Sequence, residues 1–251
     1  MANILTVAVC ISNEVTLSHF VQPIEILASI NSADIPKPGM ETVDVPFKVV
    51  FDYLAPTMDP IVSVLGPAAA TLNPTKTYAE VEASGHQYDI IWVPAGRWNL
   101  RQLFVSSLGP IFQGPPPDSF TGVDRTPKEE IDFLRAQAPK AKYILSVCSG
   151  ALQLAVSGVL SGKRATTNKA FYRVITEVAS TAKDIEWVPK ARWVIDGNVW
   201  TSSGVAAGSD MALAFLEHLA GAKLARQTRS IVEIPEVSSD DDQFASWHGL
   251  V

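Results

Sequence analysis

The amino-acid sequence predicts an α/β fold, a sandwich built around a mostly parallel sheet. Short runs rich in β-branched residues alternate with segments of helical period along most of the chain. The run at residues 142–148 is apolar almost throughout, which is typical of a parallel strand buried on both faces. No internal repeat is visible, so we expect one sheet with helices packed against it.

The N-terminal half of the chain supplies three expected strands and one helix. Residues 4–11 form a short apolar run that indicates a buried first strand. Residues 15–32 have a helical period, and Pro23 must lie near the first turn of this helix or kink it. Strands are expected again at 47–55 and at 88–96, the latter ending in a Pro-Ala-Gly turn.

The C-terminal half continues the alternation. Residues 127–141 predict an amphipathic helix with a proline near its start. The apolar strand 142–148 follows, and a helix over 149–160 begins directly after it. Residues 190–204 predict a hairpin around an Asp-Gly-Asn turn, and 208–221 a helix closed by glycine.

Two segments lie outside this pattern. Residues 109–127 are rich in proline and glycine and predict a long loop, of a length often found in lids and interface arms. The C-terminal extension, 226–251, shows no clear period. We expect its acidic stretch SSDDDQ to be a solvated loop and its apolar residues to pack on the domain or on a second subunit. We expect a single domain over 1–251, with its core at about 3–225.

Composition limits the classes of function. The chain has 251 residues, 47% of them hydrophobic and 18% charged, with a net charge of −6. No basic stripe is visible, so nucleic acid is not an expected partner. The N-terminus lacks the features of a signal peptide, and no apolar run reaches the roughly 20 residues that span a bilayer. We therefore expect no membrane association, a cytoplasmic location and two reduced cysteines.

Cys148 stands at the junction between the apolar strand and the helix that follows. Ligand sites in such sheets lie beyond the carboxyl ends of strands, and a helix N-terminus there favours thiolate over thiol. We expect a lowered pKa and a nucleophilic sulfur, with the backbone N–H of Ser149 as a donor to a developing anion. Cys10 lies inside a strand run without a helix start beside it, so we expect a core thiol there.

The segment SVCSGALQLAVSGVLSGKRATT resembles the nucleophile region of the ThiJ/PfpI superfamily, most closely its isonitrile (isocyanide) hydratase branch. DIIWVPAG and RWVIDGNVWTSSGVAAGSDMALAFLEHLAG resemble the strand opposite the cysteine and the closing hairpin and helix. The resemblance covers most of residues 3–225. It implies a flavodoxin-like three-layer α/β/α sandwich with a nucleophile elbow. Transcription regulators of this superfamily carry a DNA-binding domain, for which the residues after Gly221 are too few, so we expect a stand-alone enzyme.

The resemblance also implies an acid four residues before a proline in the first helix. The matching proline here is Pro23, and His19 stands four residues before it. An imidazolium beside the sulfur would favour the thiolate of Cys148 and act as a general acid. Glu25 matches another position that is commonly acidic in the family, with an expected supporting role.

After the nucleophile helix the family often has a histidine, and this sequence has Asn168. Asparagine can orient a substrate or water by hydrogen bonds but carries no proton at neutral pH. Thr167 is expected either to line the site or to pack at a strand end. Asp210 is expected in the first turn of the helix 208–221. There its negative charge interacts favourably with the helix N-terminus, or its side chain faces the site.

The turn after the strand 88–96 supplies the remaining candidates. Gly96 and Ala95 are expected to offer backbone N–H groups to an oxyanion. Arg97 and Trp98 follow directly. Arg97 is expected to bind an anionic group and Trp98 to form the wall of an apolar pocket, unless both are ordinary residues of a surface loop.

The resemblance implies an isonitrile hydratase-like enzyme, which adds water to R–N≡C through the cysteine and releases an N-formamide. It implies a small-molecule substrate, no metal, no cofactor and a homodimer. A glyoxalase-like or other cofactor-free lyase is a second hypothesis, weakened by the changes at positions 19 and 168. A redox-sensing or binding protein with an oxidisable cysteine is the third.

Overall fold

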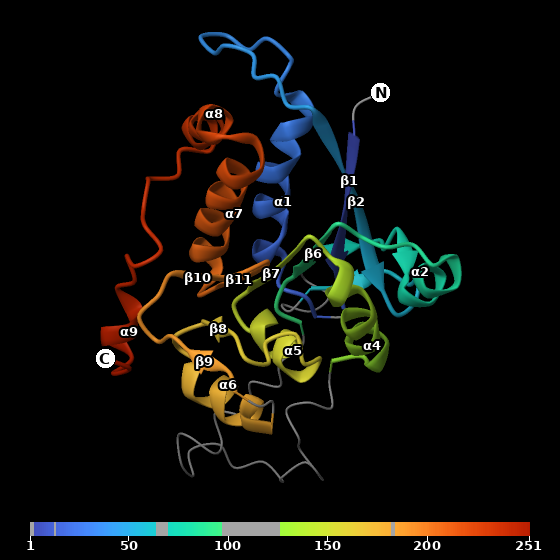
Figure 1. Ribbon diagram of the computed structural model, residues 1–251, viewed down its shortest axis with the longest axis vertical. Coiled ribbons are helices and arrows are strands. Elements are labelled where there is room, and N and C mark those ends of the chain that lie inside the picture. Colours follow the sequence, from blue (N-terminus) through green and yellow to red (C-terminus); the bar gives the residue numbers. More distant parts are fainter. Residues whose placement is uncertain (1–2, 13, 64–69, 97–125, 182–183) are drawn as a thin grey trace.

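A seven-stranded sheet forms the centre of the described structure (Figure 1). The computed structural model describes residues 3–12, 14–63, 70–96, 126–181 and 184–251. The strands of this sheet are β1 (Asn3–Cys10), β2 (Phe47–Ala55), β5 (Lys76–Thr77), β6 (Ile90–Val93), β7 (Tyr143–Val147), β10 (Trp193–Asp196) and β11 (Val199–Ser202). Their spatial order is β10-β11-β7-β6-β1-β2-β5. The β10–β11 hairpin is antiparallel, and the other pairs are parallel. Two small sheets pair β3 (Ile61–Val62) with β4 (Thr71–Leu72), and β8 (Arg164–Ala165) with β9 (Glu186–Trp187).

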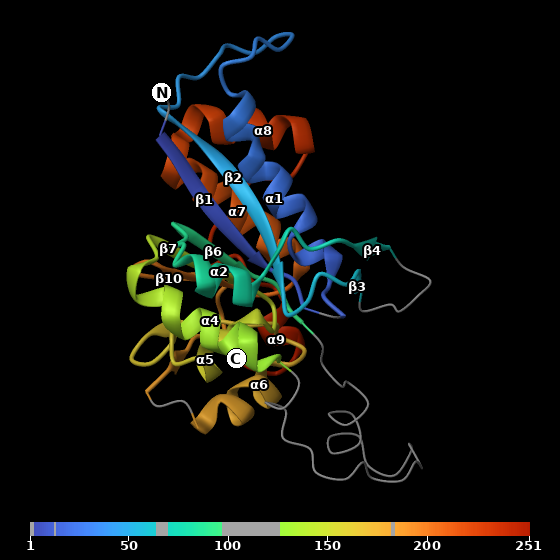
Figure 2. The same cartoon turned by 90° about the vertical axis from the view of Figure 1, so that its right-hand side faces the viewer.

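Helices cover both faces of the sheet, as Figures 1 and 2 show together. One layer contains α1 (Val21–Ala28), α7 (Val205–Ala220) and α8 (Ala222–Val232), which pack on one another. The other contains α2 (Tyr78–Ser84), α4 (Lys128–Gln137) and α5 (Gly150–Val156). The helices α6 (Tyr172–Val178) and α9 (Phe244–Trp247) lie beside the small β8–β9 sheet and at the C-terminus. Short 3₁₀ turns complete the set: η1 (Leu17–His19), η2 (Ser29–Ser32), η4 (Ala138–Lys140) and η5 (Ala179–Thr181).

The alternation of side chains along β1 explains why both faces are covered. Val7 and Val9 belong to the core cluster shared with α1 and α7, whereas Ala8 and Cys10 belong to the cluster shared with α4 and α5. Successive strand residues point to opposite faces, and all four of these are buried. A strand that is apolar on both faces needs a helical layer on each side. The predicted three-layer α/β/α sandwich is therefore confirmed.

The first helical segment is interrupted where the sequence predicted one helix. Residues 15–32 divide into η1, α1 and η2. Pro23 is the third residue of α1. The N–H groups of the first turn have no partner within a helix, so the missing N–H of proline costs nothing there. The break at Phe20 places His19 in η1, against the end of β6.

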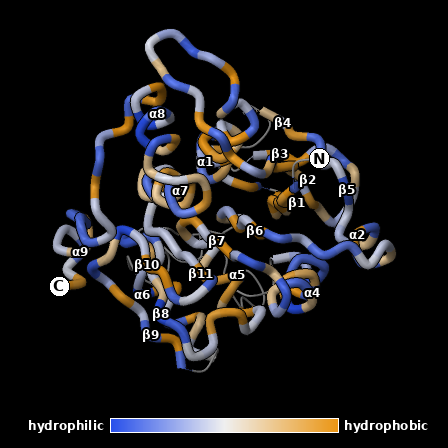
Figure 3. The backbone as a smooth tube through the Cα atoms, turned by 45° about the horizontal axis from the view of Figure 1, so that its top comes forward, coloured by the Kyte–Doolittle hydropathy of each residue, from blue (hydrophilic) through white to orange (hydrophobic). Residues whose placement is uncertain are grey.

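Several helices were missing from the sequence prediction. α2 begins with a capping box, in which Thr77 and Glu80 satisfy each other's backbone N–H groups, a local signal that the sequence contained. α6 was also missed. No clear period was seen in the C-terminal extension, but α8 runs on to Val232 and buries Leu224, Ala225 and Thr228 on one face. In Figure 3, α8 accordingly alternates between hydrophobic and hydrophilic colours.

Candidate functional site

Cys148 occupies a sharp turn between a strand and a helix. β7 ends at Val147 and α5 begins at Gly150, so two residues make the connection. The φ angle of Cys148 is +60°, in the left-handed region that non-glycine residues rarely adopt. Cys148 is buried, with 6% of its surface exposed to solvent. This is the strand-turn-helix arrangement expected of a nucleophile elbow, and it concentrates backbone strain at the sulfur-bearing residue.

Gly150 allows this turn to pack closely against the neighbouring strand. A Cβ at Gly150 would lie 2.2 Å from the carbonyl oxygen of Val93, the last residue of β6. Contacts this short do not occur, so a residue with a side chain requires the helix or the strand to move. Glycine therefore brings α5 and Cys148 against the end of β6.

The sulfur of Cys148 receives three hydrogen bonds. The backbone N–H and the hydroxyl of Ser149 donate to it, and so does the side chain of Asn168, each of them lowering the pKa. Burial acts in the opposite direction and is the larger effect, so the pKa of the thiol is raised to about 11. The expectation of a lowered pKa is wrong for the free protein, because removing the sulfur from water outweighs the three donors.

The residues after β8 hold the elbow in place. Thr167 donates from its hydroxyl to the carbonyl oxygen of Cys148 at 2.8 Å. The Oδ1 of Asn168 accepts a hydrogen bond from the N–H of Ala170 at 2.9 Å, which turns the amide nitrogen toward the sulfur. Both residues thus contact Cys148. Asn168 contacts the sulfur itself, and Thr167 contacts the backbone of Cys148.

His19 is buried at the end of β6, and its imidazole ring is uncharged at neutral pH. Its Nδ1 accepts a hydrogen bond from the N–H of Ala95 at 3.2 Å, and its carbonyl accepts one from the indole of Trp92 at 3.0 Å. Burial lowers the pKa of the imidazole to about 4. Since Nδ1 is an acceptor, the proton of the neutral ring lies on Nε2. The expected imidazolium–thiolate pair is therefore wrong at neutral pH, and the N–H of Ala95 is engaged by His19 instead of being free for an oxyanion.

With the N–H of Ala95 bonded to His19, the backbone N–H of Gly96 is the remaining expected donor of this turn to an oxyanion. No hydrogen bond from its N–H is found within the ranges that the structure describes. A Cβ at this position would lie 3.5 Å from the side-chain nitrogen of Gln153, which is on α5. Gly96 thus lies between β6 and the nucleophile helix. Arg97 and Trp98 lie outside the described residues.

Two expected site residues lie elsewhere. Glu25 is on the exposed face of α1, and the pKa of Tyr53 is raised mainly by burial and to a smaller extent by the charge of Glu25. No described contact joins it to Cys148, because α1 turns this side chain toward solvent. Asp210 is the sixth residue of α7 and not in its first turn. It is buried and pairs with Arg192, whose Nη2 and Nε lie 2.5 and 2.7 Å from its Oδ2.

The sequence analysis did not identify a buried carboxyl group that contacts the helix after Cys148. Glu130, on α4, is 0% exposed and accepts hydrogen bonds from Ser12, from Tyr78 at 3.2 Å and from Gln153 at 2.8 Å. Gln153 also donates to the carbonyl of Pro94 at 3.4 Å. Burial raises the pKa of Glu130. The amphipathic pattern of residues 127–141 could have suggested which face holds Glu130, but its partners come from distant segments.

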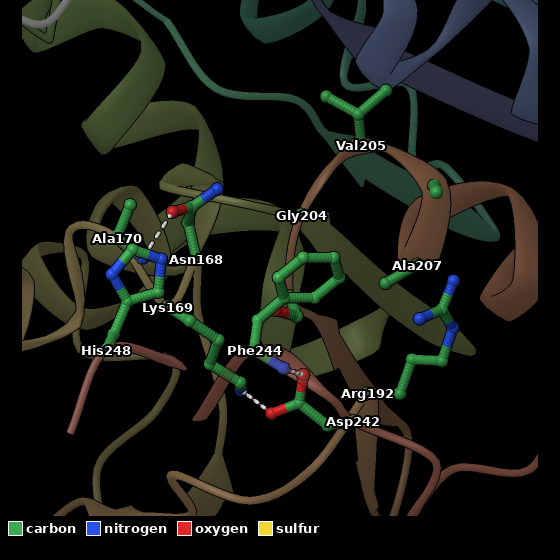
Figure 4. A pocket seen from close by; sticks show the side chains of 12 residues that line it. Asn168, Lys169, Ala170, Arg192, Gly204, Val205, Ala207, Asp242, Phe244 and His248 are labelled. Atoms are coloured by element: carbon green, nitrogen blue, oxygen red, sulfur yellow. Dashed lines mark hydrogen bonds and ion pairs between the residues drawn. The ribbon is translucent and has the colours of Figure 1, made fainter. Parts of the chain in front are cut away.

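A cavity of about 260 Å³ lies between Asn168 and the C-terminal extension (Figure 4). Lys169, Arg192, Asp242 and Phe244 are among the residues that line it. Most of SSDDDQ is an exposed loop, as expected, but Asp242 within it is buried. Asp242 lies 3.9 Å from the ammonium of Lys169, also buried. No local signal indicates this pairing, because 72 residues separate the two along the chain.

Neither a metal site nor a membrane-spanning helix is found in the described part of the chain. It contains no group of three histidine, cysteine, aspartate or glutamate side chains placed to hold a metal ion. Among the helices described, none has the length and apolar character needed to cross a membrane.

Comparisons with known proteins find similarity over the part of the chain that contains Cys148. Residues 122–218 match the DJ-1/PfpI family. An isonitrile hydratase from Pseudomonas putida is 31% identical over 167 residues, which are 66% of this chain and 59% of that protein. The chain therefore spans about three fifths of the length of this curated relative.

Solved structures share the fold. A ThiJ/PfpI family protein from Pseudomonas syringae has a TM-score of 0.65 at 21% identity, covering 96% of this chain and 80% of that one. Drosophila melanogaster DJ-1beta has a TM-score of 0.63 at 18% identity, covering 94% and 100%. An AraC family transcriptional regulator from Pseudomonas putida has a TM-score of 0.63 at 16% identity, covering 91% and 99%.

Proposed function

We propose that the chain is a member of the ThiJ/PfpI superfamily and an isonitrile hydratase-like enzyme with Cys148 as its nucleophile, a proposal supported by the family match over residues 122–218 and by the relative that is 31% identical. The geometry of Cys148 carries the proposal. A buried thiol in a strained turn, with three donors directed at its sulfur, is not needed for packing. The isonitrile hydratase of Pseudomonas putida, 31% identical, supports the choice of substrate.

The reaction begins with addition of the thiol to the terminal carbon of R–N≡C. The S–C bond forms, and the thiol proton moves to that carbon, giving the thioimidate R–N=CH–S–Cys148. A thiol whose pKa is raised to about 11 brings this proton with it, so no separate acid is needed in the first step. The Ser149 N–H and the Asn168 amide stabilise negative charge on sulfur as the S–H bond breaks.

Water then attacks the thioimidate carbon. One water proton goes to the nitrogen and the oxygen bonds to carbon, giving R–NH–CH(OH)–S–Cys148. Breaking the C–S bond returns the hydroxyl proton to sulfur and releases R–NH–CHO. The N–H of Gly96 is the proposed donor to charge on the substrate in this step. His19 stays neutral throughout and fixes the turn at Ala95 by its hydrogen bond.

The test is conversion of cyclohexyl isonitrile and an aryl isonitrile to their formamides, followed by mass spectrometry. We expect turnover by the wild type and by Cys10→Ala, and none by Cys148→Ala. Cys10 is the matched control, because it is equally buried but lies inside β1. Absence of turnover across alkyl and aryl isonitriles would refute the proposal, as would full activity of Cys148→Ala.

The rival hypotheses have less support. A glyoxalase-like reaction needs a group that moves protons between adjacent carbons, and neither neutral His19 nor Asn168 provides one. A redox sensor needs an accessible, low-pKa thiolate, whereas Cys148 is buried with a raised pKa. The expected homodimer stays a prediction, which light scattering on the purified protein tests.

A further inference from the structure

The cavity beside Asn168 has the position of a substrate pocket. Asn168 and Gly204 lie at one end of it, and a Cβ on Gly204 would be 3.6 Å from the amide nitrogen of Asn168. That nitrogen belongs to the side chain that donates to the sulfur of Cys148. Cys148 itself does not line the cavity, so Asn168 is the residue that connects the cavity with the reacting sulfur (Figure 4).

The lining of the cavity is apolar and its charges are paired. Val205, Ala207 and Phe244 contribute apolar surface. The ammonium of Lys169 donates to the carbonyl of Ala191 at 2.7 Å and to the hydroxyl of Thr166 at 2.6 Å, and lies 3.9 Å from Asp242. Arg192 is held by Asp210. A charged ligand would face two cations that are already neutralised, so desolvating its charge would not be compensated.

Asp242, Phe244 and His248 line the cavity from the C-terminal segment 239–249, and this segment is fixed at several points. The N–H of Arg192 donates to the carbonyl of Ser239 at 2.6 Å, and the guanidinium of Arg173 donates to the carbonyl of Gly249 at 2.7 Å. Asp242 accepts from the N–H groups of Phe244 and Ala245 at 3.1 and 3.2 Å, which starts α9. These contacts hold the ring of Phe244 over the cavity, between Gly204 and Asp242 in Figure 4.

We propose that this cavity holds the R group of the isonitrile and that the C-terminal segment 239–249 selects it. Phe244 sets the size of the R group, and the paired charges restrict it to uncharged, predominantly apolar groups. The proposal rests on the isonitrile chemistry proposed above for the identity of the reacting group. It assigns a function to the C-terminal extension, whose cavity-lining residues are 74 or more positions from Asn168 in the sequence but line the same cavity.

The first experiment compares Phe244→Ala with Trp247→Ala in steady-state kinetics. Trp247 is the matched control, because it lies on the same short helix but is 83% exposed and outside the cavity lining. With cyclohexyl isonitrile we expect Phe244→Ala to raise KM about tenfold and to leave kcat within about twofold. Trp247→Ala should match the wild type. Equal effects of the two changes, or no effect of either, would overturn the proposal.

The second experiment tests the charge and size of the ligand. The wild type should prefer cyclohexyl isonitrile to the anionic isocyanoacetate by at least about tenfold in kcat/KM. Val205→Phe adds an aromatic ring to the cavity wall, and we expect it to weaken turnover of cyclohexyl isonitrile more than that of methyl isonitrile. A preference for isocyanoacetate, or equal effects on the two alkyl isonitriles, would contradict the proposal.

A binding measurement separates this proposal from the proposed function. Calorimetry on Cys148→Ala with N-cyclohexylformamide reports the cavity without any reaction, and adding Phe244→Ala should weaken binding about tenfold. If no isonitrile is turned over but this Phe244-dependent binding is found, the reaction is wrong and the cavity proposal stands. If turnover depends on Cys148 but neither KM nor binding depends on Phe244, the reaction stands and the cavity proposal fails.

Discussion

The side-chain amide of Asn168 donates to the sulfur of Cys148, and its Oδ1 is held at 2.9 Å by the N–H of Ala170. Because the oxygen is fixed, the amide cannot rotate to present an acceptor to the thiol. Asn168 therefore presents a donor to Cys148, and an amide does not change its charge with pH. A histidine at this position would change its charge with pH.

Replacing Asn168 should make the Cys148 thiolate harder to form. A hydrogen bond to a charged group contributes about 1.5–3 kcal/mol, so Asn168→Ala should reduce the rate of alkylation by iodoacetamide at pH 8 about tenfold. Asn168→Asp should reduce it further, because a carboxylate beside the sulfur repels the thiolate. Both are measured by mass spectrometry in a Cys10→Ala background. A rate that is unchanged in both variants would show that the amide does not stabilise the thiolate.

His19 should make the protein less stable in acid. Its pKa is lowered from 6.5 to about 4, so between these values the unfolded chain binds a proton that the folded protein does not. The contribution of His19 is thus present above pH 6.5 and is lost as the pH falls toward 4. The full shift corresponds to about 3 kcal/mol. Urea unfolding at pH 7, 5.5 and 4.5 should show this loss, reduced in His19→Asn. An equal pH dependence in the variant would contradict it.

Removing the Glu130 carboxylate should destabilise the protein much more than removing its neighbour. Glu130→Ala leaves the buried donors of Ser12, Tyr78 and Gln153 without their acceptor, which should cost about 3 kcal/mol in the free energy of unfolding. Glu129 is exposed on the same helix, so Glu129→Ala is the control and should change stability by less than about 0.5 kcal/mol. Thermal and urea unfolding give both values, and equal losses would contradict the buried role.

Gly150 should tolerate no side chain. Gly150→Ala places a Cβ 2.2 Å from the carbonyl of Val93, so α5 must shift, and we expect a loss of about 3 kcal/mol together with lost activity. Gly96→Ala is the comparison, because its Cβ would be at an ordinary 3.5 Å from Gln153. Its stability should stay within about 1 kcal/mol of the wild type. If Gly150→Ala is as stable as Gly96→Ala, the packing of the elbow is looser than described.

Features that depend on neighbouring residues in the sequence could be predicted, whereas features that depend on contacts between distant segments could not. The placement of Cys148 could be predicted because a strand, a turn and a helix are local patterns. The capping box of α2 was local too and was overlooked. The neutral state of His19 could not be predicted, since it depends on burial and on the N–H of Ala95, 76 residues away. The raised pKa of Cys148 has the same origin, because a sequence pattern shows the donors near a thiol but not how completely water is excluded.

The sequence by itself determined the alternation of strands and helices and the position of Cys148 in the turn between a strand and a helix. These follow from the period of apolar residues and from positions close along the chain. Only the tertiary structure decided the protonation of Cys148 and His19, the burial of Glu130, and the position of the C-terminal extension against Asn168. Each of these depends on desolvation and on contacts between residues far apart in sequence, which are fixed only when the sheet and its two helical layers have assembled.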